Sequence, residues 1–418
     1  MHRLMNFGII VPMGLADEIK RRALELGFDL VGVTDASPID ASQVQFFADW
    51  LKFGFAGQMQ YMHRNFEKRI DPASLLQGAR SIICVGLNYK PATHSPSLRA
   101  RHSRARQSHH DESEIASPAF GGLAMTEPMA PVGRVAMYAQ YEDYHPFMKK
   151  RLRALVEFVS ATASPGHKFK VCVDSVPLAE RALAVRAGLG FIGKNHTLIN
   201  PTLGPQIFLG EIVTTVQLQP DEQTPCHPAP TSTEALPYNH SRPTQAPHAP
   251  RSERSEAPSP CHSERSEAEP RNLLPKSGAA PAEQELAEST TSKCATCNNC
   301  VEACPTGAMR PDGQFDANRC ISYLTIEYKG QIPADLAERI GDRLFGCDEC
   351  VLACPYQRNA PTCKNQEFAF HSDRARLDLR QILDMKEKDF NARFADSPIK
   401  HLGLQGLKRN ARICLENM

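Results

Sequence analysis

Between residues 13 and 220, apolar positions recur at the spacing of helices and strands. Repeats every three or four residues predict helices over 15–26, 44–51, 147–160 and 178–187. Alternating or continuous apolar runs predict strands over 29–33, 81–87, 135–138, 169–173 and 206–216. Because such alternation is typical of α/β and α+β proteins, we expect residues 13–220 to form one catalytic domain of that kind.

Two segments interrupt this pattern. Residues 93–130 are rich in Ser, His and Arg and then in Gly, Met and Pro, which predicts a loop insertion. Residues 221–293 hold twelve prolines and no Val, Ile, Phe or Met, so they cannot bury enough apolar surface to offset the entropy of ordering the chain. We predict a disordered insertion there, then a cysteine-rich domain over 294–365 and a helical C-terminal segment over 366–418.

Charge and hydropathy narrow the class of protein. The chain has 48 Lys and Arg against 47 Asp and Glu, so any binding of nucleic acid must come from a local basic patch. Four basic residues near the end fit either phosphate contacts or a solvated helix face: Lys400, Lys408, Arg409 and Arg412. No apolar stretch approaches the roughly 18 residues of a membrane span, and the first twelve residues make a poor signal peptide, so we expect a cytoplasmic protein that binds no membrane.

Eight of the fourteen cysteines lie between residues 294 and 354, which in a reducing compartment indicates metal ligation rather than disulfides. The first run has the spacing C-x2-C-x2-C-x3-C-P of bacterial ferredoxins, in which the fourth thiolate ligates the neighbouring cluster. The second run repeats the end of that motif, and Cys320 replaces its missing first cysteine. Crossed ligation then assigns one [4Fe–4S] cluster to Cys294, Cys297, Cys300 and Cys354, and a second to Cys304, Cys320, Cys347 and Cys350.

Structural zinc also favours cysteines in C-x2-C pairs, but it gives no reason for the third interleaved cysteine or for the Cys-Pro endings. The C-x3-C-x2-C spacing of radical-SAM sites does not occur in this region. Two adjacent clusters form a path for electrons. The chain is therefore either a ferredoxin-like electron carrier with an accessory domain, or a reductase whose first domain holds a second redox cofactor.

Three motifs in the first domain are candidates for that cofactor site. The G-x-G-x-x-G match at 188–193 follows a helix rather than opening one, which favours a helix stop and a tight loop over a dinucleotide site. Asp174 follows a strand and is either a helix N-cap or, where burial against a ligand raises its pKa, a proton donor near neutral pH. The Asp-Tyr-His triplet at 143–145 fits ordinary hydrogen bonding, metal binding or acid–base chemistry.

Taken together, the motifs resemble those of the epoxyqueuosine reductases, which complete queuosine in the anticodon of certain tRNAs. The resemblance rests on GFDLVG at 27–32, GQMQYM at 57–62, RIDP at 69–72, DYH at 143–145, VDSVPLAERALAVRAGLGFIGKN at 173–195, FLGE at 208–211, RCISYLTIE at 319–327, GCDEC at 346–350 and GLKRN at 406–410. The chain departs from the family pattern at Met137, where Arg is usual, and at Tyr356-Gln357, where Trp-Asn is usual.

The resemblance implies an α+β fold in which a nitroreductase-like domain binds cobalamin base-off, without a histidine on cobalt, beside a ferredoxin-like domain with two [4Fe–4S] clusters. It implies that Asp174 is the proton donor. Cofactor contacts are implied at Arg69, Tyr138, His145, Asp174 and Ser322.

The resemblance also implies the substrate and partners: a tRNA anticodon carrying epoxyqueuosine, and a low-potential electron donor such as flavodoxin or ferredoxin. We expect a monomer. Two alternatives stay open, a corrinoid reductase of the reductive dehalogenase kind and a non-catalytic electron-transfer protein. The first would normally carry a twin-arginine export signal, which this sequence lacks, and the second would hold no corrinoid.

Overall fold

The computed structural model describes residues 14–92, 130–221 and 294–418. The insertions predicted at 93–130 and 221–293 lie outside the described residues, apart from the end residues Ala130 and Asp221. Within the described ranges, no helix is long and apolar enough to cross a membrane.

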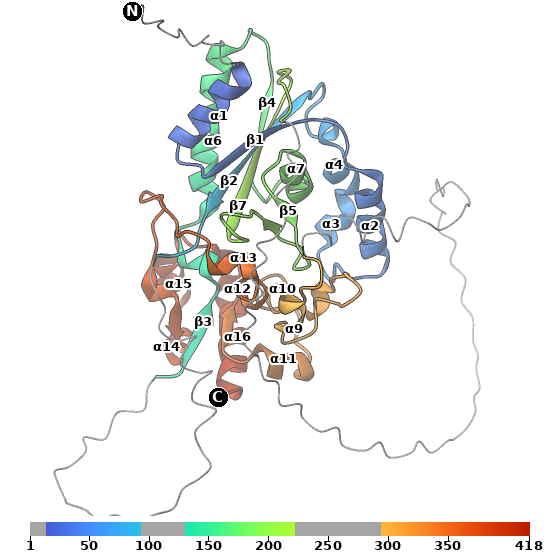
Figure 1. Cartoon of the computed structure of the whole chain (residues 1–418). Helices are drawn as coiled ribbons and strands as arrows, with labels where there is room; N and C mark the ends of the chain where they lie inside the picture. The colour runs from blue at the N-terminus through green and yellow to red at the C-terminus, as the bar shows by residue number, and fades with distance from the viewer. Residues whose placement is uncertain (1–13, 93–129, 222–293) are drawn as a thin grey trace, which may run out of the picture.

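A four-stranded sheet forms the centre of the first half of the chain (Figure 1). Its strands lie in the order β1 (Leu30–Asp35), β2 (Ser81–Asn88), β7 (Ile207–Thr214) and β4 (Phe169–Cys172), and every neighbouring pair is antiparallel. All eight residues of β2 are buried, which confirms the strand predicted from the unbroken apolar run. An antiparallel sheet covered by helices makes this half of the molecule α+β.

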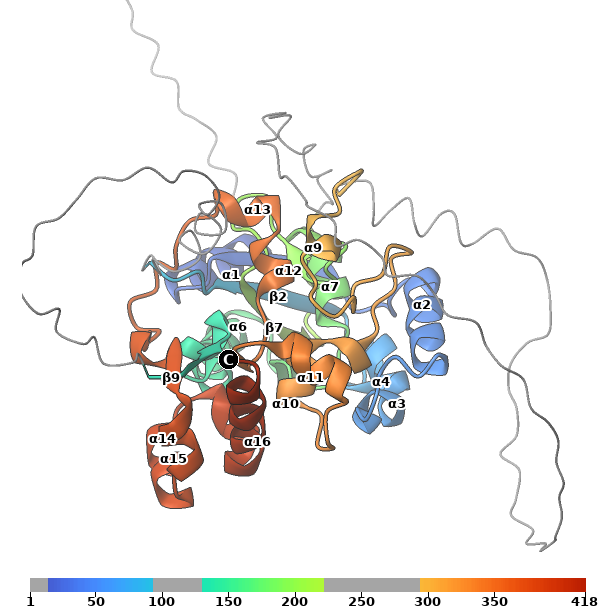
Figure 2. The same cartoon turned by 90° about the horizontal axis from the view of Figure 1, so that it is seen from below.

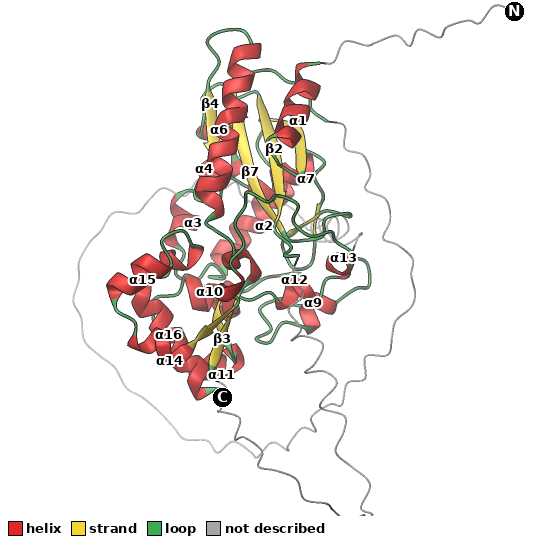
Figure 3. Ribbon diagram, turned by 90° about the vertical axis from the view of Figure 1, so that its left-hand side faces the viewer, coloured by secondary structure: helices red, strands yellow, loops and turns green. Residues whose placement is uncertain are grey.

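Different helices cover the two faces of this sheet. α1 (Leu15–Glu25) and α6 (Tyr144–Thr162) pack on one face, where Figure 3 shows them side by side, and α7 (Glu180–Arg186) packs on the other. Side chains alternate along β7, so that Ile212 joins the apolar cluster with α6 and Val213 joins the cluster with α7. Each apolar side chain buried in these clusters contributes about 1.5–3 kcal/mol.

The other elements of this half lie around the sheet. They are α2 (Ala41–Lys52), α3 (Gln60–Arg64), α4 (Phe66–Ile70), the 3-10 turn η1 (Pro72–Ser74), and the short strands β5 (Phe191–Ile192) and β6 (Leu198–Ile199). The helices predicted over 15–26, 44–51, 147–160 and 178–187 are confirmed by α1, α2, α6 and α7.

One predicted strand is displaced. The strand expected over 135–138 is β3 (Val132–Val135), and the chain then turns into the 3-10 helix η3 (Met137–Gln140). β3 pairs in parallel with β8 (Arg343–Phe345) and antiparallel with β9 (Arg376–Asp378), so it forms the centre of a second sheet. The prediction was wrong because the partners of β3 come from the far end of the sequence, where no local pattern reports them.

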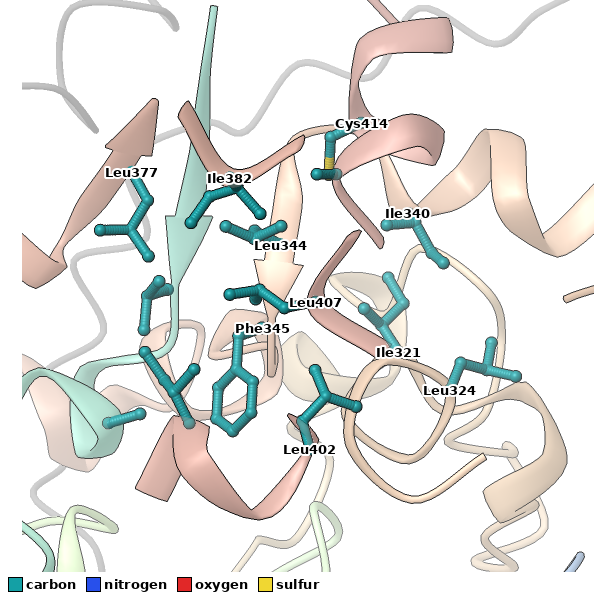
Figure 4. Packing of buried hydrophobic residues seen from close by; sticks show 14 of the residues in the cluster. Ile321, Leu324, Ile340, Leu344, Phe345, Leu377, Ile382, Leu402, Leu407 and Cys414 are labelled. Carbon is teal, nitrogen blue, oxygen red and sulfur yellow. The ribbon is translucent and has the colours of Figure 1, made fainter. Parts of the chain in front are cut away.

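The C-terminal half consists of short helices and turns around that second sheet. They are α9 (Asn299–Glu302), η4 (Ala317–Arg319), α10 (Ile321–Ile326), α11 (Ala334–Ile340), α12 (Glu349–Leu352), α13 (Pro355–Arg358), η5 (Ser372–Arg374), α14 (Leu379–Asp384), α15 (Glu387–Arg393), η6 (Pro398–His401) and α16 (Gly403–Glu416). Seen from below (Figure 2), α16 lies between α14 and α10. Figure 4 shows the core they enclose, in which Leu344 and Phe345 of β8 lie beside Leu407 of α16.

Two residues of the GLKRN motif join α16 to the rest of this core. The guanidinium group of Arg409 donates to the carbonyl oxygens of Leu324, Tyr328 and Gly330 at 2.6–3.1 Å. The Asn410 amide, fully buried, donates to the carbonyl oxygens of Thr325 and Leu344. Arg409 is therefore engaged in holding the fold, so the interpretation as a solvated side chain is wrong for this residue, and its phosphate contact stays a prediction.

Candidate active site and cluster loops

Asp174 lies in the turn that follows β4, with a backbone φ of 51°. Its side chain accepts hydrogen bonds at Oδ2 from the Tyr144 hydroxyl (3.0 Å) and from Nε2 of His145 (3.2 Å). α7 begins only at Glu180, and among the described residues no side chain caps it. The N-cap interpretation of Asp174 is therefore wrong, and its carboxyl group is committed to the triplet at 143–145 instead.

That triplet serves two purposes. Asp143 caps α6, because its Oδ1 accepts from the backbone N–H of His145, and the same oxygen lies 2.8 Å from Nδ1 of the His145 ring. With the contact to Asp174, the imidazole bridges two carboxylates. Burial disfavours the imidazolium form, but the hydrogen bonds to Asp143 and Asp174 outweigh it and raise the pKa of His145 to about 9. The proton of this group therefore resides on His145 at neutral pH.

The Asp174 carboxyl group is correspondingly ionised. Its hydrogen bond to His145, which outweighs burial, holds the pKa of Asp174 below its usual range. The condition stated for a proton donor, a raised pKa, is thus not met by Asp174 in this arrangement. Tyr144 fixes the geometry, since its ring stacks between His145 and Phe208 at centroid distances of 4.1 and 4.2 Å.

From exposure and burial together we infer that Asp174 faces a recess. Its side chain is 62% exposed, yet the surrounding protein is dense enough for burial to oppose its ionisation. Arg181 is likewise exposed while burial lowers its pKa, and burial raises the pKa of the half-buried Tyr138. Accessible groups that are desolvated by their surroundings lie in a concavity rather than on a convex surface.

The recess extends toward the cysteine loops. The pKa of Tyr138 is raised by burial and then by the charges of Asp174 and Asp348, so this ring lies between the triplet and the residue after Cys347. The backbone N–H of Met137 donates to Asp348 (2.8 Å). Met137 stands where the pattern described above usually has Arg, and its contact with the cysteine loop is made by the backbone rather than by the side chain.

The interactions among the cysteine thiols are compatible with the two sets predicted from crossed ligation, which stay a prediction. Burial and then the neighbouring thiols of Cys294, Cys297 and Cys354 raise the pKa of Cys300 to about 11. In the second group, burial and then the charges of Asp348 and the Cys320 thiol raise the pKa of Cys347 to about 12. Burial raises the pKa of Cys350, and thiols of both groups raise it further, so this cysteine lies near both. The thiols are those of Cys347, Cys320, Cys300 and Cys304. No three His, Cys, Asp or Glu side chains in the described part of the chain converge closely enough to bind one metal ion directly.

Residues 188–195 join the first domain to the cysteine loops. Gly188 ends α7 with a φ of 76°, as the helix-stop interpretation predicted. A Cβ on Gly190 would lie 2.3 Å from the carbonyl oxygen of Ile199, so the loop requires glycine there. The Lys194 ammonium group donates to the carbonyl oxygens of Ala295 and Cys297 and to the Asn298 side chain, each at 2.9–3.0 Å.

The predicted cofactor contacts separate into two places. Arg69, Tyr138, His145 and Asp174 gather at the recess, and Nε of Arg69 is buried with no hydrogen-bond partner among the described residues. Ser322 lies elsewhere, against the second cysteine group, where its hydroxyl donates to the carbonyl oxygen of Cys347 (3.5 Å) and hydrogen-bonds the Cys320 thiol. Three further charged residues near Asp174 were not predicted: Glu180 and Arg181, which lie in VDSVPLAER, and Glu211, which ends FLGE.

This arrangement defines a class of protein: an iron–sulfur protein whose cluster loops adjoin an acid–base site. A family model for a 4Fe-4S double cluster binding domain matches residues 293–357. A second model, described as epoxyqueuosine reductase QueG, DUF1730, matches residues 69–175.

Known proteins identify the family. The chain is 32% identical over 405 residues to an epoxyqueuosine reductase of Burkholderia pseudomallei, which covers 96% of this chain and 81% of that protein. It is 28% identical over 403 residues to the epoxyqueuosine reductase of Escherichia coli, with 96% and 81% covered. The solved structure of the Streptococcus thermophilus epoxyqueuosine reductase shares the fold, with a TM-score of 0.67, 23% identity, and 97% and 82% covered. The chain belongs to the epoxyqueuosine reductase family.

Proposed function

We propose that this protein reduces the epoxide of epoxyqueuosine in a tRNA anticodon to queuosine. The observation that carries the proposal is the chain of contacts from Asp143 through His145 to Asp174, which opens into a recess beside the cysteine loops. Removing an epoxide oxygen as water requires two electrons and two protons. A chain that places a proton store between a recess and two sets of cluster ligands fits that requirement.

His145 and Asp174 carry the acid–base part of this proposal. The proton held on His145 passes along its hydrogen bond to Oδ2 of Asp174, which delivers it to the epoxide oxygen as the carbon–oxygen bond breaks. A second proton, taken up from solvent by His145, completes the loss of water. Replacing the solvent around Asp174 with a large ligand would raise its pKa toward that of His145, which favours the transfer.

The residues at the recess fit a cobalamin. Nε of Arg69 is buried without a hydrogen-bond partner among the described residues, and it and the Tyr138 hydroxyl would offer polar contacts to this group, whereas both ring nitrogens of His145 are already engaged by carboxylates. This last point supports binding without histidine on cobalt. When bound, cobalamin would be the two-electron reducing centre, and the clusters would be its source of electrons. We propose that the sheet domain is of the nitroreductase kind and that the crossed cysteine sets hold the clusters.

The substrate proposal draws support from a relative. A solved structure with 23% identity, a TM-score of 0.67 and 96% of this chain covered is described as an epoxyqueuosine reductase with an epoxyqueuosine-modified tRNA-Tyr stem loop. A modified base in an anticodon loop can leave the stack at low cost and enter a recess. We further propose a cytoplasmic monomer that receives electrons from a flavodoxin or ferredoxin.

The test is anaerobic incubation of reconstituted protein with cobalamin, a strong reductant and tRNA that carries epoxyqueuosine. Mass spectrometry of the released nucleosides should show loss of one oxygen. Asp174→Asn, which keeps the side-chain shape, should bind the corrinoid but leave the nucleoside unchanged. Epoxyqueuosine that stays unreduced, although the clusters are intact and the corrinoid is bound, would overturn the substrate assignment. Protein that binds no corrinoid would point to an electron carrier.

A further inference from the structure

Two carboxyl groups beside Asp174 take no part in the proton path described above. Glu211 is fully buried on β7, and by strand alternation it points to the face that packs against α7. Glu180 is the first residue of α7, and the two carboxyl groups lie within hydrogen-bonding reach of each other. The fold therefore brings one carboxyl group from the sheet and one from the helix into contact.

Among the described residues, no basic side chain contacts Glu211 directly. Its cross-strand neighbours are Cys84 on β2 and Cys172 on β4, both fully buried. Neither carboxyl oxygen of Glu211 receives a hydrogen bond from an N–H or O–H group in the residues that the structure describes. The charged groups around the pair lie on the Glu180 side: Asp174, Arg69 and Arg181.

Two carboxylates in contact cannot both be ionised at neutral pH. Burial, followed by the charge of Glu180, raises the pKa of Glu211 well above its ordinary value. Burial, followed by the charge of Asp174, also raises the pKa of Glu180. Glu211 is the more deeply buried of the two, so it holds the proton, and its hydroxyl can then donate to Glu180.

Glu180 has a second contact, which links the pair to the active site. Its Oε1 accepts a hydrogen bond from the backbone N–H of Asp174 at 2.6 Å. Asp174 has a left-handed backbone with φ of 51°, a conformation that costs a non-glycine residue free energy and persists only when its surroundings fix it. The hydrogen bond to the Glu180 carboxylate helps to fix this backbone conformation of Asp174.

We propose that Glu180 and Glu211 share one proton and act as a positioning pair for Asp174. Protonated Glu211 donates to the Glu180 carboxylate, which in turn accepts the Asp174 N–H and keeps the turn in its left-handed conformation. The shared proton stays within the pair, and the single negative charge that remains favours the protonated form of the Asp174–His145 couple. The inference rests on the proposed function only in giving Asp174 the task of proton delivery.

The shared proton can be observed without turnover. At about pH 8, surface carboxyl groups are ionised, so the infrared carbonyl band of a protonated carboxyl group reports buried acids alone. We expect purified wild-type protein to show such a band, shifted in heavy water and shifted again when glutamate is labelled with carbon-13. The label separates glutamates from aspartates such as Asp348, whose pKa burial raises to about 6. Glu211→Gln, which keeps the shape and a donor toward Glu180, should lose the band.

Single-turnover kinetics then test the positioning role. Glu211→Gln keeps one negative charge and the donated hydrogen bond, so its pH profile should match wild type. The double change Glu180→Gln with Glu211→Gln removes that charge, which lowers the pKa of His145 and should move the alkaline limb of the rate to lower pH by about one unit.

A missing glutamate band in wild type, a band retained in Glu211→Gln, or an unmoved alkaline limb in the double variant would each overturn the proposal. The labelled wild-type measurement decides the proton sharing even where a variant fails to fold. Failure of the proposed function has a different signature: wild-type protein would then show the glutamate band but leave the tRNA unchanged.

Discussion

The charge of the Asp174 carboxyl group depends on its contact with His145. The pKa of His145 is about 9, because burial lowers it by less than the hydrogen bonds to Asp143 and Asp174 raise it. The rate of a single turnover that needs this proton should be constant at neutral pH and should fall as the pH rises through about 9. The sign follows because deprotonated His145 has nothing to pass to Asp174. A rate that rises through this range would contradict the assignment.

Asp143→Asn tests the origin of that pKa. Asparagine caps a helix as well as aspartate does, so α6 should keep its start, but the carboxylate that stabilises the imidazolium ion is lost. The alkaline limb should move to lower pH by about one unit, as measured by single-turnover rates across the pH range. Unchanged thermal stability above about pH 9, where His145 is neutral and the ion pair no longer contributes, would be the control that the cap survives.

The same ion pair contributes to stability with a defined sign. The pKa of His145 is raised on folding, so its contribution is fully present below the ordinary value of 6.5 and is lost as the pH rises through about 9. Denaturant unfolding of wild type and His145→Gln should therefore differ most in free energy at low pH, and converge above that value.

Asp174→Asn should slow the chemical step by about 10²- to 10⁴-fold, the range for loss of a general acid, with little change in the binding of tRNA. Ser175→Ala is the matched control one residue away, because the Ser175 hydroxyl contacts the Val173 carbonyl oxygen and the Lys149 side chain rather than the His145 couple. Equal losses in both variants would show that the turn, and not the carboxyl group, is what matters.

At the scale of elements, α16 is attached by Arg409. Arg409→Ala leaves three carbonyl oxygens without their donor, so the free energy of unfolding should fall by about 2–4 kcal/mol. Arg412, exposed on the same helix, provides the control: Arg412→Ala should change the free energy by less than about 0.5 kcal/mol. Urea titration measures both. A loss of tRNA affinity with unchanged stability in Arg409→Ala would support the phosphate-contact interpretation.

Elements with a strong local signal could be predicted from the sequence, and those defined by distant partners could not. The buried strand β2 and the amphipathic helices α1 and α6 follow from their own apolar spacing. β3 lies upstream of the predicted range, because its position depends on pairing with Arg343 and Asp378. The GQMQYM segment likewise owes its place to a distant ring, since the backbone N–H of Gln58 donates to the Tyr323 hydroxyl at 2.6 Å.

The same distinction holds for the site. A double cluster domain could be predicted from the cysteine spacing because ligand count and order are local properties, and the division of the cysteines into two sets stays a prediction. The meeting of Asp174 with His145 could not be, since it depends on how β4 and α6 lie in space. Glu211 was overlooked because one acidic residue within an apolar strand gives no periodic signal, although an acid in such a strand is itself unusual.

At the scale of the whole molecule, crossed ligation makes a prediction about pairs of cysteines. Cys297→Ser combined with Cys354→Ser removes two ligands from the same cluster and should cost about four iron atoms. Cys297→Ser combined with Cys350→Ser damages both clusters and should cost about eight. Iron and sulfide analysis of anaerobically reconstituted protein distinguishes the outcomes. The reverse pattern would assign Cys350 to the first cluster, and equal losses in both combinations would argue against separate sets.

The second sheet ties the timing of folding to the direction of synthesis. A ribosome releases β3 well before its partners β8 and β9, which lie far beyond it in the sequence. Until then the central strand has two open edges, which nascent-chain chaperones would have to shield. A chain truncated before residue 376 would therefore hold every strand of its first sheet but lack β9, one of the two partners of β3.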